Sequence, residues 1–294
     1  MEAWLLLQFV FSGLTSGAIY ALIALGFCVV EKSLRIVNFA QGDFLTLAGF
    51  LTCTLLEALR LPWPLAALLA VGGTGLAGFL LERLTLRPAR SRDPLTLIFI
   101  TIGASIFLHG FFKLLWGKNP RILPAPISGP PVRLFGASLT RESLLVLGVA
   151  LVSVLVLQAF YQFSRPGKAL RAIAANPRAA TLLGLPVPFL TGLSFFVAGA
   201  LGAVAGLLIV PITGVSFDSG VILGLKGYAA AVLGGYGSFP GAVLGGLLLG
   251  LMESLVAGFF SSGFRDVFAF GLLLAVLALR PRGLLGKSEG ERFS

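Results

Sequence analysis

Residues 4–30 read WLLLQFVFSGLTSGAIYALIALGFCVV and contain no charged side chain. A helix needs about 20 apolar residues to cross the hydrocarbon core of a bilayer, and this run is longer than that. The run has no basic leading segment and continues beyond the apolar region of a signal peptide. We therefore expect it to remain in the mature chain as a membrane helix.

The rest of the chain has the same apolar character. Of its 294 residues, 57% are hydrophobic and only 12% are charged, and the mean hydropathy is +0.98. A soluble globular protein or a disordered chain of this composition is excluded, because neither could shield so much apolar surface from water. The net charge of +10 does not indicate nucleic acid, because the Lys and Arg residues are scattered between apolar runs and form no basic face.

Nine hydrophobic segments follow one another along the chain. The second begins with polar residues and the seventh is rich in glycine, so either could be a broken or re-entrant helix. We expect an all-α, polytopic membrane helical bundle with eight to ten transmembrane segments, built as one domain over residues 1–294. The nine segments are 4–30, 38–58, 62–82, 94–116, 143–162, 188–211, 219–235, 240–260 and 264–280.

The distribution of basic residues predicts the orientation in the membrane. With nine spans, most of the 22 Lys and Arg residues fall in loops on one side, which is typical of the cytoplasmic side. This arrangement places the N-terminus outside, and the loop 163–187 and the tail 281–294 inside. The segment 117–142 contains five prolines, so we expect an extended, ordered cover on the outer face.

The inner loop 163–187 reads FSRPGKALRAIAANPRAATLLGLPV and predicts two short helices. The first would cover about 168–175. Asn176 is a typical N-cap, Pro177 suits the first helical position, and Gly184 suits the residue after a helix that covers about 177–183. Four basic residues and no acidic one favour two interpretations: a docking element for a soluble partner, or an amphipathic helix on anionic lipid headgroups.

A small set of polar side chains falls inside the apolar segments. Ionisable groups are costly in a membrane, so each is a candidate for the substrate path, for gating, or for polar packing between helices. The set consists of Asn38, Gln41, Asp43, His109, Lys113, Lys226 and Glu253.

Each charged member of this set also has a structural interpretation. Asp43 and Lys226 could form a buried ion pair between helices, and Glu253 could lie at the membrane interface beside an arginine. Lys113 lies near a helix end and could extend its ammonium group to the interface. His109 could be a neutral, hydrogen-bonded histidine.

The sequence gives no sign of enzymatic chemistry. The two cysteines, Cys28 and Cys53, lie in apolar stretches as small buried residues, and no metal-ligand spacing occurs. A single histidine leaves no basis for a catalytic triad. The residues Gly286-Lys287-Ser288 end like a phosphate-binding loop, but position 281 is proline where that motif requires glycine. ATP hydrolysis by this chain is therefore not expected.

Three stretches, in order along the chain, resemble one family of transporters. VNFAQGDF at 37–44 and LKGYAAAVLGGYGSFPGAVLGGLLLGLMES at 225–254 resemble hallmarks of the LivH-type permeases of branched-chain amino acid importers. Between them, the loop 163–187 resembles the reduced Glu-Ala-Ala loop motif of permeases of ATP-binding cassette (ABC) importers. Ala179, Ala180 and Gly184 match that motif, and Arg178 stands where the glutamate would be.

The resemblance implies a permease subunit that imports leucine, isoleucine and valine. In such transporters a loop, here about 165–185, forms a coupling helix that sits in a groove of a cytoplasmic ATPase. The residues that this implies for coupling are Arg171, Asn176, Pro177, Arg178, Ala179, Ala180 and Gly184. The candidates for the translocation path are Asn38, Gln41, Gly42, Asp43, Lys226, Tyr228 and Glu253.

The same resemblance implies the partners and the location. They are a homologous permease subunit, two cytoplasmic ATP-binding subunits that hold ATP and magnesium, and a periplasmic or extracellular solute-binding protein that supplies most of the selectivity. The chain itself would bind no cofactor and no metal. It would lie in the bacterial cytoplasmic (inner) membrane, surrounded by lipid, with its C-terminus in the cytoplasm.

Other functions stay open from the residues alone. Urea, short amides or other apolar amino acids are alternative cargo for a permease of this family. A secondary transporter would use Asp43 and Glu253 as ion sites and would not require the basic 163–187 loop. A channel or a purely structural membrane subunit is a third alternative.

Overall fold

A computed structural model of the protein describes residues 3–91, 93–127, 129–134, 136–280 and 283–286. The predicted tail at 281–294 therefore lies mostly outside the described residues. So do two of the three residues of the Gly286-Lys287-Ser288 sequence.

Every predicted hydrophobic segment forms a helix, and the 163–187 loop forms two more. The described residues contain α1 (Ala3–Leu34), α2 (Gln41–Glu57), α3 (Trp63–Leu81), α4 (Pro94–Trp116), α5 (Arg141–Phe163), α6 (Arg165–Ala175), α7 (Pro177–Leu182), α8 (Val187–Thr213), α9 (Ser219–Gly234), α10 (Phe239–Phe259) and α11 (Arg265–Leu279). A π-helical turn, η1 (Glu82–Leu86), continues α3, and a 3-10 turn, η2 (Ser262–Phe264), precedes α11. The strands β1 (Val132–Leu134) and β2 (Ala137–Leu139) form one antiparallel hairpin.

Local capping explains where several helices begin and end. Helix α1 continues without a break to Leu34, and Arg35 then adopts a φ of 55°, which is incompatible with a continuing α-helix. Helix α6 begins at Arg165, three residues before the predicted start, because the Ser164 hydroxyl accepts a hydrogen bond from the Gly167 N–H at 3.0 Å. These differences do not alter the order or the type of any element.

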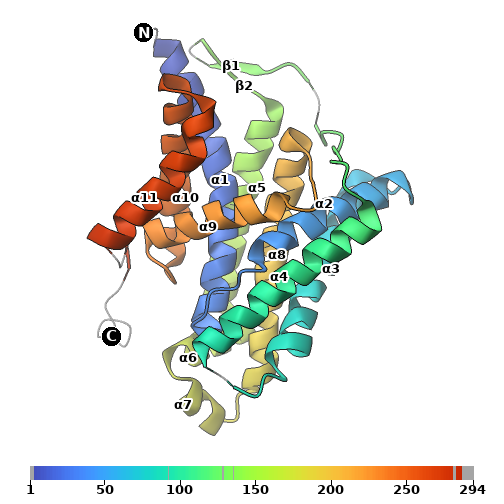
Figure 1. Ribbon diagram of the computed structural model, residues 1–294, viewed down its shortest axis with the longest axis vertical. Coiled ribbons are helices and arrows are strands. Elements are labelled where there is room, and N and C mark those ends of the chain that lie inside the picture. The colour runs from blue at the N-terminus through green and yellow to red at the C-terminus, as the bar shows by residue number, and fades with distance from the viewer. Residues whose placement is uncertain (1–2, 92, 128, 135, 281–282, 287–294) are drawn as a thin grey trace.

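Helix α1 is the centre of the bundle. It packs against α10, α8, α9 and α5, and most of its apolar section is buried. Burial on all sides is expected for a helix that is apolar on all sides. Helices α4 and α5 are the opposite case, because most of their apolar surface is exposed and available to lipid or a partner. Figure 1 shows α1 running along most of the length of the molecule, with α9 lying across it.

Six helices are long and apolar enough to cross a membrane by length and composition: α1, α3 with η1, α4, α5, α8 and α10. Helices α2, α9 and α11 have 17, 16 and 15 residues. At 1.5 Å per residue they are about 22–26 Å long, which is short of the roughly 30 Å hydrocarbon core. The predicted all-α polytopic bundle is confirmed, with three of its nine apolar segments formed by shorter helices.

The two polar ends of the molecule lie far apart. Figure 1 shows the β1–β2 hairpin near the start of α1, while α6 and α7 lie at the opposite end. Side chain and backbone hydrogen bonds attach the described part of the proline-rich segment to the helices. Gln8 exchanges hydrogen bonds with the backbone of Ser138 at 3.0 and 2.8 Å, and Arg121 pairs with Val215 at 2.9 and 2.8 Å.

Glycines allow α1 and α10 to approach closely. A Cβ added at Gly17 would lie 2.8 Å from the Cα of Leu247, and one added at Gly13 would lie 2.7 Å from the Cα of Leu251. Real Cβ atoms do not come so close to backbone, so the central contact of the bundle depends on residues without side chains.

Replacing Gly17 with alanine should therefore lower stability, because the helices must separate to accommodate one methyl group. We expect a loss of about 1–3 kcal/mol, the usual range for overpacking. Gly103→Ala on α4 is the matched control, because nothing lies within 4 Å of its added Cβ. Thermal unfolding in detergent micelles would measure both, and equal melting temperatures for the two variants would contradict this account of the contact.

Candidate functional site

A cavity of about 260 Å³ opens between α1, α2, α4 and α9. Most of its wall is apolar or aromatic, with glycine backbone on the α9 side. Its polar groups are few, and two of them carry charge. The lining residues are Phe27, Phe39, Asp43, Ile102, Ser105, Ile106, His109, Gly220, Val221, Gly224, Leu225 and Tyr228. This mixture suits a small molecule with an apolar body and a charged group.

The charged groups of the cavity are Asp43 and His109. Asp43 Oδ1 lies 2.7 Å from His109 Nε2, so the two form an ion pair when the imidazole is protonated. His109 Nε2 is the one charged group of the described residues within ion-pair distance of this carboxylate, and Oδ2 accepts no hydrogen bond from them. Asp43 is only 1% exposed, whereas the His109 side chain is 23% exposed. The carboxylate is thus almost fully buried with a single charged neighbour.

Glycines place this carboxylate against α9. Gly42 packs directly on the backbone of Gly220 and lies close to Gly224, so the first turn of α2 meets the first turns of α9 without side chains between them. Asp43 follows Gly42 immediately and therefore sits beside this crossing. Any side chain at Gly42 would push α9 away and change the width of the cavity.

Aromatic rings form the α1 side of the cavity. Tyr228 packs against Phe27 with ring centroids 5.6 Å apart and against Phe39 with centroids 6.3 Å apart. Tyr236 contacts Tyr228 edge to face at 5.8 Å. The aromatic group joins α1, the α1–α2 connection and α9, so it fixes one wall of the cavity.

A second polar cluster lies on the other side of α9. Lys226 Nζ is 3.0 Å from Glu253 Oε1 and 2.7 Å from Asp266 Oδ1. The Tyr20 hydroxyl donates a hydrogen bond to Glu253 Oε2 at 2.7 Å. Lys226 and Glu253 are almost fully buried, and the cluster joins α9 to α1, α10 and α11. Successive helical residues are about 100° apart, so Lys226 and Tyr228 on α9 point to different sides.

The structure separates the predicted path residues into two groups. Asp43 and Tyr228 line the cavity, with Gly42 at its edge. Lys226 and Glu253 belong to the second cluster and do not line the cavity. The considered ion pair between Asp43 and Lys226 is wrong, because each residue has a different charged partner. Glu253 pairs with a lysine rather than with a neighbouring arginine.

The other two predicted path residues are buried in the helix packing. Asn38 and Gln41 are fully buried, and neither lines the cavity. Gln41 Nε2 donates to the Ala198 carbonyl of α8 at 2.9 Å, and Asn38 Oδ1 accepts from the Ala40 N–H at 3.2 Å. Their visible contacts tie the start of α2 to its surroundings.

Helix α4 supplies cavity residues that the sequence analysis did not single out as a group. Ile102, Ser105, Ile106 and His109 recur at spacings of three and four residues, which places them on one face of the helix. That spacing was a usable signal, but it became informative only once α4 was known to face Asp43. Lys113 continues on α4, where its ammonium lies 5.6 Å from the centre of the Phe217 ring.

The predicted coupling loop forms two capped helices. Asn176 Oδ1 accepts hydrogen bonds from the N–H groups of Arg178 and Ala179, each at 3.0 Å, and Pro177 is the first residue of α7. At the other end Gly184 adopts a φ of 77°. Ala180 is buried, whereas Arg171, Arg178 and Ala179 are exposed. The N-cap and the C-terminal glycine predicted for α7 are confirmed.

Two leucines at the tip of this element were not among the predicted coupling residues. Leu182 is 89% exposed and Leu183 is 80% exposed. Together with the basic residues of α6 and α7 they form an apolar and cationic surface at one end of the molecule. Such an exposed pair of leucines is typical of a contact surface rather than of a helix that packs within its own chain.

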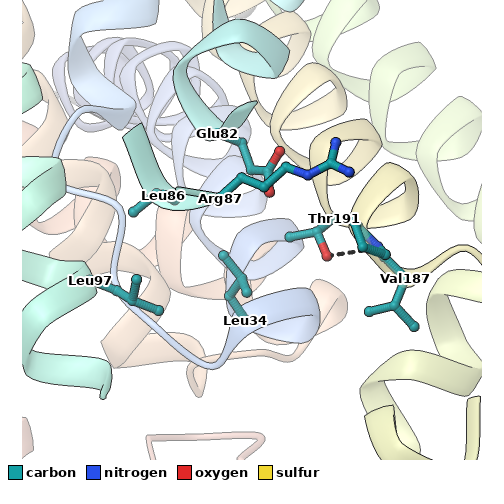
Figure 2. A pocket seen from close by; sticks show the side chains of 8 residues that line it. Leu34, Glu82, Leu86, Arg87, Leu97, Val187 and Thr191 are labelled. Atoms are coloured by element: carbon teal, nitrogen blue, oxygen red, sulfur yellow. Dashed lines mark hydrogen bonds between the residues drawn. The ribbon is translucent and has the colours of Figure 1, made fainter. Parts of the chain in front are cut away.

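A smaller cavity of about 30 Å³ lies next to the coupling element. Figure 2 shows it at the junction of the end of α1, the η1 turn, α4 and the first turns of α8, with Leu34, Leu97 and Val187 among its lining residues. Glu82 from η1 and Arg87, which follows it, also line the cavity, and Glu82 is buried. The π-helical turn therefore lies where α3 meets the helix that leaves the coupling element.

The described residues contain no group of three or more His, Cys, Asp or Glu side chains that could hold a metal ion. The site instead consists of one largely apolar cavity with a buried carboxylate, a separate buried ion cluster, and a two-helix element at the end of the bundle. The cavity has the lining that a small amphiphilic molecule requires.

Comparison with known proteins relates the whole chain to one group. A sequence-family model described as the permease component of the branched-chain amino acid transport system matches residues 9–277. The high-affinity branched-chain amino acid transport system permease protein LivH of Escherichia coli is 36% identical, with 97% of each chain covered. The permease protein BraD of Pseudomonas aeruginosa is also 36% identical, with 99% of each chain covered.

More distant similarities extend to an archaeal protein and to a solved structure. A probable branched-chain amino acid transport permease of Methanocaldococcus jannaschii is 27% identical over 90% of this chain and 88% of its own. The solved structure of PsaBC from Streptococcus pneumoniae in complex with Fab aligns with a TM-score of 0.50 at 15% identity. It covers 95% of this chain and 91% of the PsaBC chain. At that identity the similarity concerns the fold alone.

The second polar cluster gives a prediction about stability. Lys226→Met should destabilise the chain by roughly 3–5 kcal/mol, because it leaves the Glu253 carboxylate buried without its cation. Lys226→Met combined with Glu253→Gln should recover most of that loss. Asp266→Asn is the control, because Asp266 is 56% exposed and its loss should matter little. Unfolding in mixed micelles would measure all four proteins, and unchanged stability of Lys226→Met would show that the pair is not structural.

Proposed function

This chain belongs to the family of permease components of branched-chain amino acid transport systems, and on that premise we propose that it is the membrane subunit of an ATP-driven importer of leucine, isoleucine and valine. It is a multi-pass membrane permease of an amino acid transport system. ATP hydrolysis is assigned to separate subunits, so the chain itself acts as a transport component and not as an enzyme.

The α6–α7 element is the observation that carries the ATP-driven part of the proposal. It is held rigid by caps at both ends of α7 and presents Leu182 and Leu183 to its surroundings. The same two-helix element exposes Arg165, Lys168, Arg171 and Arg178 and contains no acidic residue. A groove with an apolar floor and an acidic rim on an ATP-binding subunit would complement this surface. A carrier that works without an ATPase has no need for such an element.

The connection from α7 to α8 supports the transmission of movement. Leu185 and Val187 lead directly from the coupling element into α8, and α8 packs against α3, α1 and α2. Rotation of α6 and α7 by a bound ATPase would therefore act on the helices that surround the large cavity. Packed helices tend to switch between discrete arrangements, which suits alternating access from the two sides.

The large cavity supports apolar amino acids as cargo. Its wall of phenylalanine, isoleucine, valine and leucine side chains suits an aliphatic side chain, and its polar groups are too few for tight binding. Weak binding favours release and leaves most of the selectivity to an external solute-binding protein. The proposed path runs past Asp43 and Tyr228, with Gly42 setting the spacing of α2 and α9. Lys226, Glu253, Asn38 and Gln41 hold the surrounding helices.

The proposed assembly contains this chain and a homologous permease subunit, two cytoplasmic ATP-binding subunits that hold ATP and magnesium, and a periplasmic or extracellular solute-binding protein. The chain would bind no cofactor of its own. Its place is the bacterial cytoplasmic (inner) membrane, with α6, α7 and the C-terminus in the cytoplasm and the β1–β2 hairpin outside. The excess of basic residues on the α6–α7 side supports this orientation.

Exposed leucines allow a direct test of ATPase coupling. Leu182→Asp with Leu183→Asp should abolish co-purification of the ATP-binding subunits and reduce ATP-driven leucine uptake in proteoliposomes at least about tenfold, because carboxylates cannot enter an apolar, acidic-rimmed groove. Leu182→Met with Leu183→Met keeps the apolar surface and is the matched control. The amount of chain in the membrane should stay the same in both.

Gly184 provides a second variant for the same test. Nothing lies within 4 Å of a Cβ added there, but its φ of 77° is unfavourable for a bulky residue. Gly184→Val should therefore distort the end of α7 and abolish coupled uptake without preventing membrane insertion. Normal co-purification and uptake by the aspartate double variant would overturn the assignment of α6–α7 as the coupling element.

Uptake by the purified assembly would identify the cargo. Labelled leucine, isoleucine and valine should accumulate in liposomes only with ATP and the solute-binding protein, while urea and short amides should not. Accumulation of urea or an amide in preference to leucine would show that this permease carries one of the alternative substrates instead. Uptake by this chain alone, driven by a proton or sodium gradient, would favour a secondary transporter.

A further inference from the structure

We propose that Asp43 binds the ammonium group of a small amine or zwitterion in the cavity between α1, α2, α4 and α9, and that His109 is the internal group that this ammonium displaces. The inference rests on the proposed function and deepens it, because it names the chemical group that the passage recognises. It concerns residues of this chain alone and does not require the external solute-binding protein.

The state of the Asp43 carboxylate is the first argument. Both oxygens are buried, and Oδ2 accepts no hydrogen bond from a described residue. A buried carboxylate oxygen without a hydrogen bond is costly and calls for a partner. The one charged neighbour is His109, whose Nε2 lies 2.7 Å from Oδ1. An ammonium group carries three donors and could fill the unused positions on both oxygens.

The charges around the cavity are the second argument, because they favour a cation. Asp43 and His109 are the charged residues in its wall. The ammonium of Lys226 points to the far side of α9, where Glu253 and Asp266 neutralise it. Lys113 lies further along α4 against the Phe217 ring, and the Asp218 carboxylate accepts a hydrogen bond from the Ser216 hydroxyl. A free carboxylic acid entering the cavity would meet Asp43 without a lysine or arginine in the wall to balance it.

The aromatic wall is the third argument. The rings of Phe27, Phe39 and Tyr228 pack together on one side of the cavity. Aromatic faces attract cations and also provide apolar surface, so they suit an ammonium group joined to a hydrocarbon chain. Ile102, Ile106 and Leu225 provide further apolar surface for that chain.

His109 makes the site weak and reversible. When no ligand is bound, its imidazole occupies the position beside Asp43, so the buried carboxylate keeps a neighbour throughout the cycle. An incoming ammonium must compete with this imidazole, which lowers its affinity and favours release. Urea and neutral amides carry no ammonium charge and should not displace His109.

A direct test uses the fact that His109 is the one histidine of the chain. The full chain, purified with a tag that contains no histidine, is labelled with ¹³C,¹⁵N-histidine and placed in lipid nanodiscs. The imidazole signal is followed at fixed pH during titration with leucine, 3-methylbutylamine, 4-methylpentanoate and urea. The amine lacks the carboxylate of leucine, and 4-methylpentanoate lacks its ammonium.

Leucine and 3-methylbutylamine should shift the His109 signal in a saturable manner, while 4-methylpentanoate and urea should not over the same range. A shift by 4-methylpentanoate equal to that by the amine would overturn the inference, because apolar contact alone would then explain binding. Absence of any shift with the amine would overturn it as well.

Variants separate the two residues. Asp43→Asn should weaken 3-methylbutylamine binding at least about tenfold, the effect expected from loss of a charged hydrogen-bond acceptor. His109→Gln should tighten binding of labelled leucine several-fold in a scintillation proximity assay, because a neutral amide replaces the charged competitor. Should Asp43→Asn fail to fold, His109→Gln still decides, since unchanged or weaker binding would overturn the displacement. Asp266→Asn, in the other cluster, is the control and should bind like the unmodified chain.

The His109 titration tests the binding site, and ATP-driven uptake tests the importer, so failure of one can be distinguished from failure of the other. ATP-driven leucine uptake by the assembled transporter without an ammonium-dependent His109 signal would remove the binding site and leave the importer. An ammonium-dependent signal in a chain whose assembly takes up no leucine would remove the importer and leave the binding site.

Discussion

The backbone contact between Gly42 and Gly220 is the constraint on which the site depends. Because neither residue has a side chain, the first turns of α2 and α9 touch directly, and Asp43 follows at the edge of that contact. The distance between these two helices determines the opening beside Tyr228 and Gly224. A methyl group added at Gly42 would meet the Gly220 carbonyl, so it would force the two helices apart and change the width of the cavity.

Two polar clusters lie on opposite sides of the short helix α9, and their charged groups have different partners. On one side, Lys226 satisfies Glu253 and Asp266, and the Tyr20 hydroxyl completes the pairing with α1. A cluster with compensated charges holds helices together in a membrane. On the other side, Asp43 has His109 beside Oδ1, and no described residue donates a hydrogen bond to Oδ2. Both carboxylates are buried, but Glu253 has a lysine at one oxygen and a tyrosine hydroxyl at the other, whereas Asp43 has His109 at one oxygen and no described partner at the other.

The hairpin end and the α6–α7 end of the molecule are attached to the helix bundle in different ways. The β1–β2 hairpin and the proline-rich segment are attached by hydrogen bonds to Gln8 on α1 and to Val215 after α8. The α6–α7 element joins directly to α8 and exposes its leucines. Helix α8 therefore leads from the α6–α7 element to the residue that pairs with the proline-rich segment, and it packs against α1 and α2, which line the cavity. The π-helical turn at Glu82, beside the first turns of α8, gives α3 a local irregularity at the same level.

The sequence by itself determined the features that depend on local rules. Apolar runs required membrane helices, and Asn176, Pro177 and Gly184 defined the boundaries of α7, because capping and backbone preferences act within a few residues. The motifs at 37–44 and 225–254 were sufficient to indicate the family. Only the tertiary structure decided which polar side chains meet. Asp43 pairs with His109 from α4, and Lys226 with Glu253 and Asp266, although all of them looked alike as charges within apolar segments. Their partners depend on how helices rotate and cross, and that depends on close packing between segments far apart in the chain.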